Sequence, residues 1–478
     1  MLKRAKIHKY FLNNKYIVLD INSGGVHIVD EIVYDILDLY EDSSLDEIIE
    51  LFINKYEKTN IIDAYKEITS LVEDGLLFSD EIDLEFDYNS ENIIKAMCLH
   101  VAHDCNLKCS YCFASQGNFK GERTLMSLEI GKKTLEFLAK NSGNRKNLEV
   151  DFFGGEPLMN FELVKDLVTY GRKIEKQYNK KFRFTITTNG VLLDKEKIDY
   201  INENMDNIVL SLDGRKEIND KMRQTINGNG SYDLVLPKFK EMVEKRGDKD
   251  YYIRGTFTNK NIDFSNDVLE FYNQGFKKVS VEPVVTSEEM DYALRKEHLD
   301  DILREYEIFS KEYINFKRKD QDFYFFHFMV DLSQGPCIVK RSVGCGAGSE
   351  YIAVTPEGDL YPCHQFVGNK DFLLGNVDDG IINANLRNMF KNSNVYTKEE
   401  CRNCWAKFYC SGGCHANAYY SHGNISKPYK LECEMEKKRI ECSISILANL
   451  EDEWWRLKTA TQQFLYFWDD FHYMGKYL

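Results

Sequence analysis

The sequence predicts an α/β fold with a parallel sheet, because short apolar runs alternate with longer segments of helical period between residues 95 and 285. Two further observations place smaller units on either side. Short strand-like and helical segments alternate before residue 90, and cysteine and glycine become frequent after residue 337. The strand–helix repeat is typical of a partial barrel or of a doubly wound sheet. In both folds the chemistry takes place at the carboxyl ends of the strands.

Residues 1–90 form the first predicted unit. Residues 16–20 and 26–29 alternate apolar and polar side chains as strands do, and Asn22-Ser-Gly-Gly25 suits a hairpin turn between them. Three segments with helical period follow, at residues 31–40, 44–56 and 64–74. An acidic stretch at residues 80–90 predicts a linker to the rest of the chain.

Residues 91–290 carry the strand–helix repeat. Its strands are expected in six apolar runs, at residues 94–101, 148–153, 182–187, 207–212, 251–257 and 278–281. Helical period between them is clear at residues 128–140, 158–175 and 232–245. Residues 291–336 are expected to be a mostly helical connection.

The last third of the chain has a different composition. Apolar periodicity weakens over residues 337–445, so we expect this region to lack a large core and to be organised by metal sites. Residues 446–478 hold three of the four tryptophans, which favours either a helix docked on the body or a contact with a partner.

Composition excludes several classes of function. Lys and Arg total 62 and Asp and Glu total 77, so the net charge of −15 disfavours nucleic acid and anionic membranes as partners. No apolar run approaches the roughly 18 residues of a membrane span, and the apolar stretch after the basic start is broken by Asn13, Asn14 and Lys15. A cytoplasmic location is expected. The 13 cysteines of a chain in a reducing compartment then indicate metal binding rather than disulfides.

The first cysteine group follows the first predicted barrel strand, with the spacing Cys105-x3-Cys109-x2-Cys112. Three thiolates on one loop can hold three corners of a 4Fe–4S cluster and leave one iron open, since soft thiolates select iron–sulfur clusters or zinc. A structural zinc site would need a fourth ligand, and none lies nearby in the sequence.

This spacing, with Tyr111 before the third cysteine, resembles the signature of the radical S-adenosylmethionine (SAM) superfamily. Further elements of that family recur in order at successive strand ends, and their residues are Gly154, Gly155, Glu156, Pro157, Thr188, Asn189, Ser211, Asp213 and Arg223. The resemblance implies a partial (β/α)6 barrel in which these residues bind SAM. It implies that the glycines let the backbone approach the methionine amino group, that Glu156 holds that group, that Asp213 lies by the ribose and that Arg223 faces the carboxylate.

The resemblance also implies an activity, in which a reduced cluster cleaves SAM to a 5′-deoxyadenosyl radical that abstracts hydrogen from an unactivated carbon. A non-catalytic iron–sulfur electron carrier or a zinc scaffold is the alternative from a different class. Neither has a use for a SAM-binding element.

The second cysteine group resembles the SPASM extension of peptide-modifying radical SAM enzymes. The resemblance implies a distal auxiliary 4Fe–4S cluster on Cys401, Cys404, Cys410 and Cys433. It implies a proximal one on Cys345, Cys363 and Cys414, to which either Cys337 or a substrate thiolate adds the fourth ligand. The chain would then hold three 4Fe–4S clusters. A pair of zinc ribbons is the alternative, and Cys98 and Cys442 are expected to be buried thiols without a ligand role.

Residues 1–90 resemble, at the level of the fold, the winged-helix-like peptide-recognition element of enzymes that mature ribosomally made peptides. The amino-acid sequence of residues 7–445, taken as a whole, is similar to the sequences of maturases of SCIFF peptides (six cysteines in forty-five residues). This implies thioether formation between a cysteine sulfur and a carbon of an acceptor residue, in a precursor whose leader adds a strand to a sheet edge. An electron donor such as flavodoxin or ferredoxin is expected. Formylglycine formation in sulfatases and carbon–carbon cross-linking are the alternative chemistries.

Overall fold

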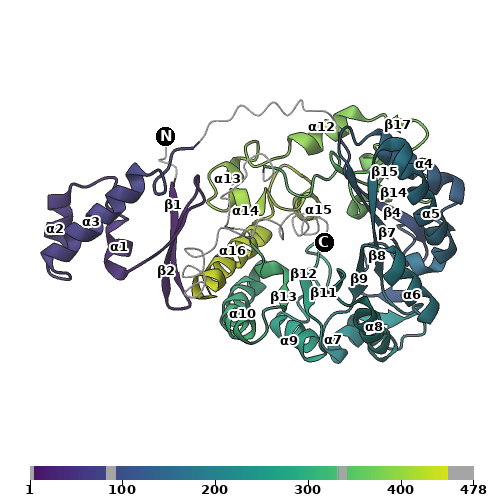
Figure 1. Ribbon diagram of the computed structural model, residues 1–478, viewed down its shortest axis with the longest axis horizontal. Coiled ribbons are helices and arrows are strands. Elements are labelled where there is room, and N and C mark those ends of the chain that lie inside the picture. The colour runs from purple at the N-terminus through teal and green to yellow at the C-terminus, as the bar shows by residue number, and fades with distance from the viewer. Residues whose placement is uncertain (1–4, 82–92, 331, 333–341, 451–478) are drawn as a thin grey trace.

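The computed structural model describes residues 5–81, 93–330, 332 and 342–450, and its main feature is one curved sheet (Figure 1). The sheet has 12 strands, which are β4 (Ala96–His103), β6 (Thr124–Leu125), β7 (Asn147–Gly154), β8 (Lys181–Thr188), β9 (Asn207–Ser211), β11 (Tyr252–Phe257), β12 (Lys278–Pro283), β13 (Tyr324–Phe325), β14 (Tyr351–Val354), β15 (Asp359–Tyr361), β16 (Gly375–Asn376) and β17 (Gly380–Ile381).

Six of these strands are parallel and lie in sequence order, β4-β7-β8-β9-β11-β12. A doubly wound sheet reverses its strand order at a switch point, whereas a barrel adds each strand beside the last. The order therefore confirms the predicted partial barrel, and Figure 1 shows the strands following an arc. Its helices are α4 (Leu128–Lys140), α5 (Phe161–Tyr178), α6 (Lys195–Asn204), α7 (Lys216–Met222), α8 (Tyr232–Arg246), α9 (Ser265–Asn273) and α10 (Leu299–Lys319).

The two faces of the arc differ in polarity. In β7, Leu148, Val150 and Phe152 are buried while Glu149 and Asp151 between them stay half-exposed, and β8 has the same alternation. Parallel strands buried on both faces read as continuous apolar runs. The alternation here means that helices cover one face and that the other face lines a polar interior.

The N-terminal unit is a three-stranded antiparallel sheet with three helices. The sequence predicted the three helices and two of the strands, and β1 lies N-terminal to these two. Its elements are β1 (Ile7–Leu12), β2 (Lys15–Asp20), β3 (Val26–Val29), α1 (Glu31–Ile36), α2 (Leu45–Phe52) and α3 (Lys58–Glu73). Ser44 caps α2 in a capping box with Glu47, and this explains why that helix begins there. Val18 of β2 packs against the unit's own helices, while Ile17 and Leu19 face the C-terminal part of the chain.

The cysteine-rich region continues the barrel sheet instead of forming a separate layer. β14 pairs in parallel with β4, and β15, β16 and β17 add antiparallel strands beyond it. Its helices are α12 (Ala384–Asn392), α13 (Glu399–Arg402), α14 (Lys407–Cys410), α15 (His415–His422) and α16 (Lys430–Leu450). The first five residues of the segment 446–478 belong to α16, and the rest of that segment lies outside the described residues, as does Cys337.

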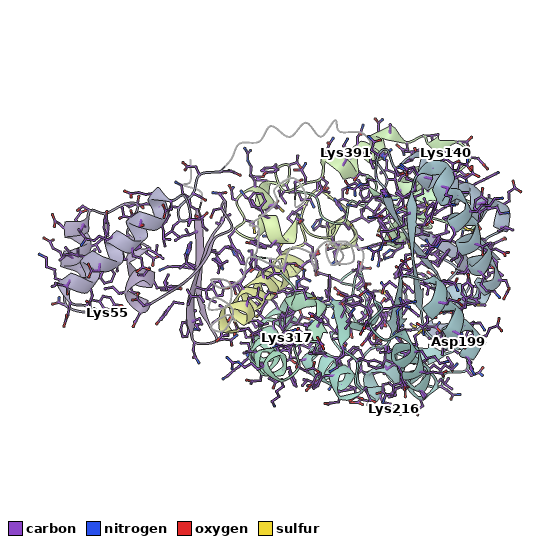
Figure 2. The ribbon with its side chains drawn as sticks, in the orientation of Figure 1. Lys55, Lys140, Asp199, Lys216, Lys317 and Lys391 are labelled. Carbon is purple, nitrogen blue, oxygen red and sulfur yellow. The ribbon has the colours of Figure 1, made fainter. Side chains whose placement is uncertain are left out.

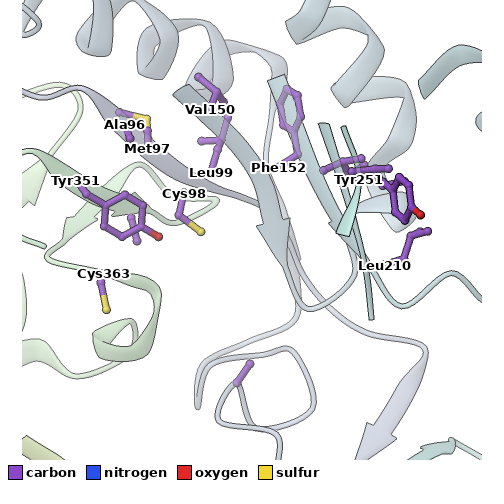
Figure 3. Packing of buried hydrophobic residues seen from close by; sticks show 14 of the residues in the cluster. Ala96, Met97, Cys98, Leu99, Val150, Phe152, Leu210, Tyr251, Tyr351 and Cys363 are labelled. Atoms are coloured by element: carbon purple, nitrogen blue, oxygen red, sulfur yellow. The ribbon is translucent and has the colours of Figure 1, made fainter. Parts of the chain in front are cut away.

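The expectation that this region lacks a large core was wrong. Ile352, Val354, Phe366 and Phe390 are fully buried and belong to the same apolar cluster as the barrel strands. The periodicity looked weak because these side chains come from very short strands and single turns. Figure 3 shows the resulting contact, in which Tyr351 lies beside Cys98 of β4.

Charged side chains are distributed over the rim of the molecule. Figure 2 shows Lys55, Lys140, Asp199 and Lys216 pointing outward from helices and loops. Among the described helices, none combines the length and the apolarity that crossing a bilayer requires.

Candidate functional site

The cysteine loop is fixed by a short antiparallel ladder. Cys109 ends β5 (Leu107–Cys109) and pairs with Arg223 at the start of β10 (Arg223–Thr225), and the backbone N–H of Ser110 donates to the carbonyl of Met222 at 2.8 Å. Two predicted elements that are over 100 residues apart in sequence are thereby held side by side.

The Gly-Gly-Glu-Pro element, residues 154–157, packs against the same loop. The N–H of Gly155 donates to Ala102 O and that of Glu156 to Asp104 O, both at 2.9 Å. A Cβ on Gly154 would lie 2.2 Å from Ala102 O, and one on Gly155 would lie 2.2 Å from Asp104 O. Gly154 also has a φ of +128°. In this structure the glycines let strand β7 approach the cysteine loop itself.

Glu156 joins the ends of two neighbouring strands. Its Oε1 accepts hydrogen bonds from Leu158 N and from Thr188 Oγ1, and its Oε2 accepts one from Asn189 N at 2.8 Å. The side chain is fully buried, and burial raises its pKa to about 7 against the opposing effect of these donors. Both oxygens accept hydrogen bonds within the protein, and the contact with the SAM ammonium that the resemblance implies stays a prediction. Pro157 follows at the start of the turn Pro157–Asn160.

Asn189 connects the end of β8 to the first cysteine. Its Nδ2 donates to Asn106 Oδ1 at 2.8 Å and lies 3.7 Å from Cys105 Sγ. Sequence reasoning did not single out Asn106, although its place inside the cysteine motif was a signal.

Tyr111 of the cysteine loop contacts two buried charged residues, Asp213 and Arg223, and is itself partly buried. The Tyr111 hydroxyl donates to Asp213 Oδ2 at 2.6 Å, and the Arg223 guanidinium lies over the Tyr111 ring with its carbon 5.5 Å from the centroid. Arg223 Nε lies 3.0 Å from Asp213 Oδ1 without hydrogen-bond alignment. Asp213 is fully buried and orients its neighbours, while Ser211, at the end of β9, stays half-exposed.

The residues around the loop fit a metal cluster carrying an anionic ligand. Burial raises the pKa of Cys105 and of Cys109 to about 12, so these thiols need a metal cation to ionise. Leu107 N and Asn189 Nδ2 donate to Cys105 Sγ and would support a bound thiolate. Two buried donors beside the loop, Asn106 Nδ2 and Arg223 Nε, have no hydrogen-bond partner and suit a ligand with acceptor oxygens.

The polar face of the arc begins next to this loop. Thr187 Oγ1 of β8 lies 3.2 Å from both carboxylate oxygens of Asp151 of β7, and burial raises the pKa of Asp151 to about 7. Further along, Glu282 Oε2 lies 3.0 Å from His327 Nε2, whose Nδ1 lies 2.9 Å from the Tyr306 hydroxyl. These side chains are polar groups paired with one another on the side of the sheet that its helices leave uncovered.

The C-terminal cysteines fall into two sets of neighbours. Burial raises the pKa of Cys363 and Cys414, and the nearby Cys345 thiol raises both further. The second set consists of Cys404 and three neighbouring thiols, Cys401, Cys410 and Cys433. Burial is the main cause that raises the pKa of these three thiols, and nearby acidic groups raise it further. The first set holds residues expected as proximal ligands and the second those expected as distal ligands, and the binding of clusters by either set stays a prediction. Within the described residues no three such side chains converge as tightly as around a single metal ion.

Glu432 lies between the two sets and was not singled out from the sequence. Its Oε1 accepts a hydrogen bond from Cys414 N at 2.9 Å, and the next residue is Cys433. Cys98 and Cys442 are both buried outside the sets, as expected.

Comparison with known protein families identifies one domain in the barrel and one in the cysteine-rich region. Residues 99–258 match the Radical SAM superfamily, and residues 345–405 match SPASM, described as an iron-sulfur cluster-binding domain. The chain carries a radical SAM domain followed by a SPASM domain. The cofactors of these domains are SAM and 4Fe–4S clusters.

The names of two similar proteins indicate different reactions. A cysteine-type anaerobic sulfatase-maturating enzyme of Clostridium novyi is 25% identical over 72% of this chain and 93% of its own length. The radical SAM cyclopropyl synthase TigE of Paramaledivibacter caminithermalis is 23% identical over 87% of this chain and 89% of its own.

Solved structures share the fold of the radical SAM and SPASM domains. The structure of anSMEcpe with bound AdoMet is 22% identical and covers 75% of this chain and 99% of its own, with a TM-score of 0.62. Streptococcus suis SuiB bound to S-adenosylmethionine is 16% identical and covers 90% of this chain and 99% of its own, with a TM-score of 0.52.

Proposed function

We propose that this chain forms thioether cross-links in a ribosomally made, cysteine-rich precursor peptide of the SCIFF type. A cysteine sulfur of the peptide is joined to a carbon of an acceptor residue. The overall change removes one hydrogen from the thiol, as a proton, and one from the carbon, as a hydrogen atom that the 5′-deoxyadenosyl group of SAM would accept. The remaining electron would pass to an auxiliary cluster, so SAM, cleaved to methionine and 5′-deoxyadenosine, would be the net oxidant.

The N-terminal sheet is the observation that carries this proposal. β2 lies in the middle of the sheet, and β1 is held against α16 by the hydrogen bond from the Tyr10 hydroxyl to Glu441 O. β3 pairs only with β2 among the described strands, and its Ile28 is 43% exposed. An edge of this kind can accept a leader peptide as an added strand.

The coverage of the relatives supports a peptide substrate. The sulfatase-maturating relative is matched almost completely yet leaves more than a quarter of this chain unmatched. SuiB, in its structure bound to the precursor peptide SuiA, covers 90% of this chain with a TM-score of 0.50. In this proposal the N-terminal unit binds the leader of the precursor, a function that sulfatase maturation does not need.

In this proposal Cys105, Cys109 and Cys112 hold one cluster, with Arg223, Asn106 and Asn189 near the SAM carboxylate and amino groups. When bound, SAM and this cluster supply the 5′-deoxyadenosyl radical that removes hydrogen from carbon. The polar face at Asp151 receives the peptide, and the surrounding barrel excludes water. Reduction by flavodoxin or ferredoxin and a cytoplasmic location belong to the proposal.

The auxiliary clusters are proposed on the two cysteine sets described above. The proximal set has three cysteines within the described residues, and its fourth ligand is either Cys337 or the substrate thiolate. Iron measured per chain after anaerobic reconstitution should be about twelve, and about eight in the Cys105/Cys109/Cys112→Ala variant. Loss of a further cluster in Cys337→Ala would exclude the open proximal site.

Mass spectrometry of a cysteine-rich precursor treated with the reduced holoenzyme tests the reaction. A thioether removes two hydrogen atoms and blocks alkylation of one thiol by iodoacetamide. A carbon–carbon cross-link also removes two hydrogen atoms but leaves every thiol open to alkylation, and formylglycine formation replaces a thiol with an aldehyde. Unchanged alkylation or an aldehyde would refute thioether formation. Absence of 5′-deoxyadenosine would favour the electron-carrier alternative.

A further inference from the structure

The N-terminal unit rests directly on the segment that carries the distal cysteines. Ile17 and Leu19 of β2 are fully buried in a small apolar cluster with Ala406 of this segment and with Ile440 and Ile444 of α16. The cluster is separate from the barrel core, so it belongs to this contact alone.

An aromatic stack marks the centre of the contact. The ring of His8 on β1 lies parallel to the Trp405 ring, with 3.8 Å between the centroids and 4° between the planes. His8 Nε2 also lies 2.9 Å from Glu441 Oε1 of α16. Trp405 directly follows Cys404, so one of the proposed distal ligands is adjacent in sequence to the residue on which β1 rests.

A buried ion pair makes a second, independent connection. Lys407 Nζ lies 2.8 Å from Glu81 Oε1, and the Lys407 side chain is only 5% exposed. A buried ammonium group needs such a partner, because desolvation of an unpaired charge is costly. Glu81 lies at the end of the N-terminal unit, and Lys407 lies three residues before Cys410. The pair therefore connects the two parts.

The supporting segment has little regular structure of its own. α13 and α14 have four residues each, which is too short for a helix to be stable by backbone hydrogen bonding alone. Three of the proposed distal ligands, Cys401, Cys404 and Cys410, lie in or beside these turns, and Cys433 lies in the first turn of α16. Binding of metal by four such thiols fixes the backbone between them.

We propose that the distal cluster has a positioning role, in which it holds Trp405 and Lys407 as the platform on which the N-terminal unit docks. This inference rests on the proposed assignment of the distal ligands. Because coupling between two sites is reciprocal, docking of the N-terminal unit must in turn stabilise the distal cluster. The distal site thus orients the peptide-recognition sheet toward the barrel, whatever part it also has in electron transfer.

Hydrogen–deuterium exchange of the full reconstituted chain tests the proposal without a peptide. The Cys401→Ala/Cys404→Ala variant is compared with the proximal variant Cys345→Ala/Cys363→Ala, and each is expected to lose about four iron per chain. Amides of β1 and β2 should exchange at least tenfold faster in the distal variant and at the wild-type rate in the proximal one. Equal exchange of β1 and β2 in both variants would overturn the positioning role.

Variants that keep every cysteine distinguish a loss of docking from a general folding defect. Trp405→Ala and Glu81→Gln should retain the full iron content at first but lose the distal iron to a chelator several-fold faster than the wild type. Phe11→Ala is the matched control, since this side chain is also on β1 but is 54% exposed. Chelation of Trp405→Ala at the Phe11→Ala rate would refute the coupling. Because no peptide is used, a failure of thioether formation would leave these results intact and would count only against the proposed function.

Discussion

Replacement of Asp213 by asparagine should destabilise the cysteine loop far more than a surface substitution of the same kind. Asp213 is fully buried and provides the negative charge next to Arg223, which is itself 8% exposed. Asparagine has the same shape and retains an oxygen for the N–H of Thr256, which donates to Asp213 Oδ1 at 3.0 Å. The substitution removes the charge, and it also replaces Oδ2, which accepts the Tyr111 hydroxyl at 2.6 Å, with an amide nitrogen that can only donate to that hydroxyl.

The expected magnitude follows from the burial of the pair. Removal of one partner from a buried ion pair costs about 3–5 kcal/mol, because the other charge is left uncompensated. The exposed pair Arg215–Asp263, in which the Asp263 side chain is 50% exposed, gives a matched control. Such exposed pairs contribute about 0–1 kcal/mol, so Asp263→Asn should have a small effect.

Amide exchange of the β5–β10 ladder is the assay, because Arg223 begins β10 and the Ser110 N–H bonds to Met222 O. A loss of about 3–5 kcal/mol corresponds to exchange that is faster by roughly two to four powers of ten, if the ladder opens locally. Asp263→Asn should leave the same amides within about a factor of five of the wild type. Equal effects of the two variants would refute the assignment of Asp213 as the charge that holds Arg223.

Three other predictions follow from the same region. The pKa of Glu156 is raised from 4.5 to about 7 in the folded state, so the free energy of unfolding should fall by about 3 kcal/mol as the pH rises through this range. Urea midpoints should show that Glu156→Gln removes this fall and that the exposed Glu162→Gln does not. Gly155→Ala, whose Cβ would meet a backbone oxygen at 2.2 Å, should lose the iron of the cluster proposed on Cys105, Cys109 and Cys112, whereas Gly121→Ala, whose Cβ would meet only a backbone oxygen at 3.4 Å, should keep it. Phe152→Ala should cost about 3–5 kcal/mol in thermal unfolding because Phe152 is fully buried, and a cost below about 1 kcal/mol would contradict its place in the core.

The sequence was informative where the information is local. The alternation of apolar runs with helical segments predicted the six parallel strands. The order of the motifs predicted which residues lie at their carboxyl ends, such as Asn189 and Asp213. The choice between a barrel and a doubly wound sheet depended on which strands are neighbours. That is a long-range property, and periodicity along one strand does not contain it.

Other features depend on contacts that no local pattern encodes. The pairing of β14 with β4 joins residues that are about 250 positions apart, so the shared core of the two domains was missed. The role of Glu156 also depends on the backbone N–H of Asn189 from the next strand. The family motif singled out Glu156 from the sequence, and the fold shows which groups surround it.

The ladder between β4 and β14 has a practical consequence for work with fragments. A fragment that ends before residue 351 would leave the backbone groups of Ala96–Leu99 on that side of β4 without their partner strand. An exposed edge flanked by buried apolar side chains is a template for pairing with another chain. We therefore expect the radical SAM part, produced alone, to aggregate through this edge, and the two domains to unfold together in the intact protein.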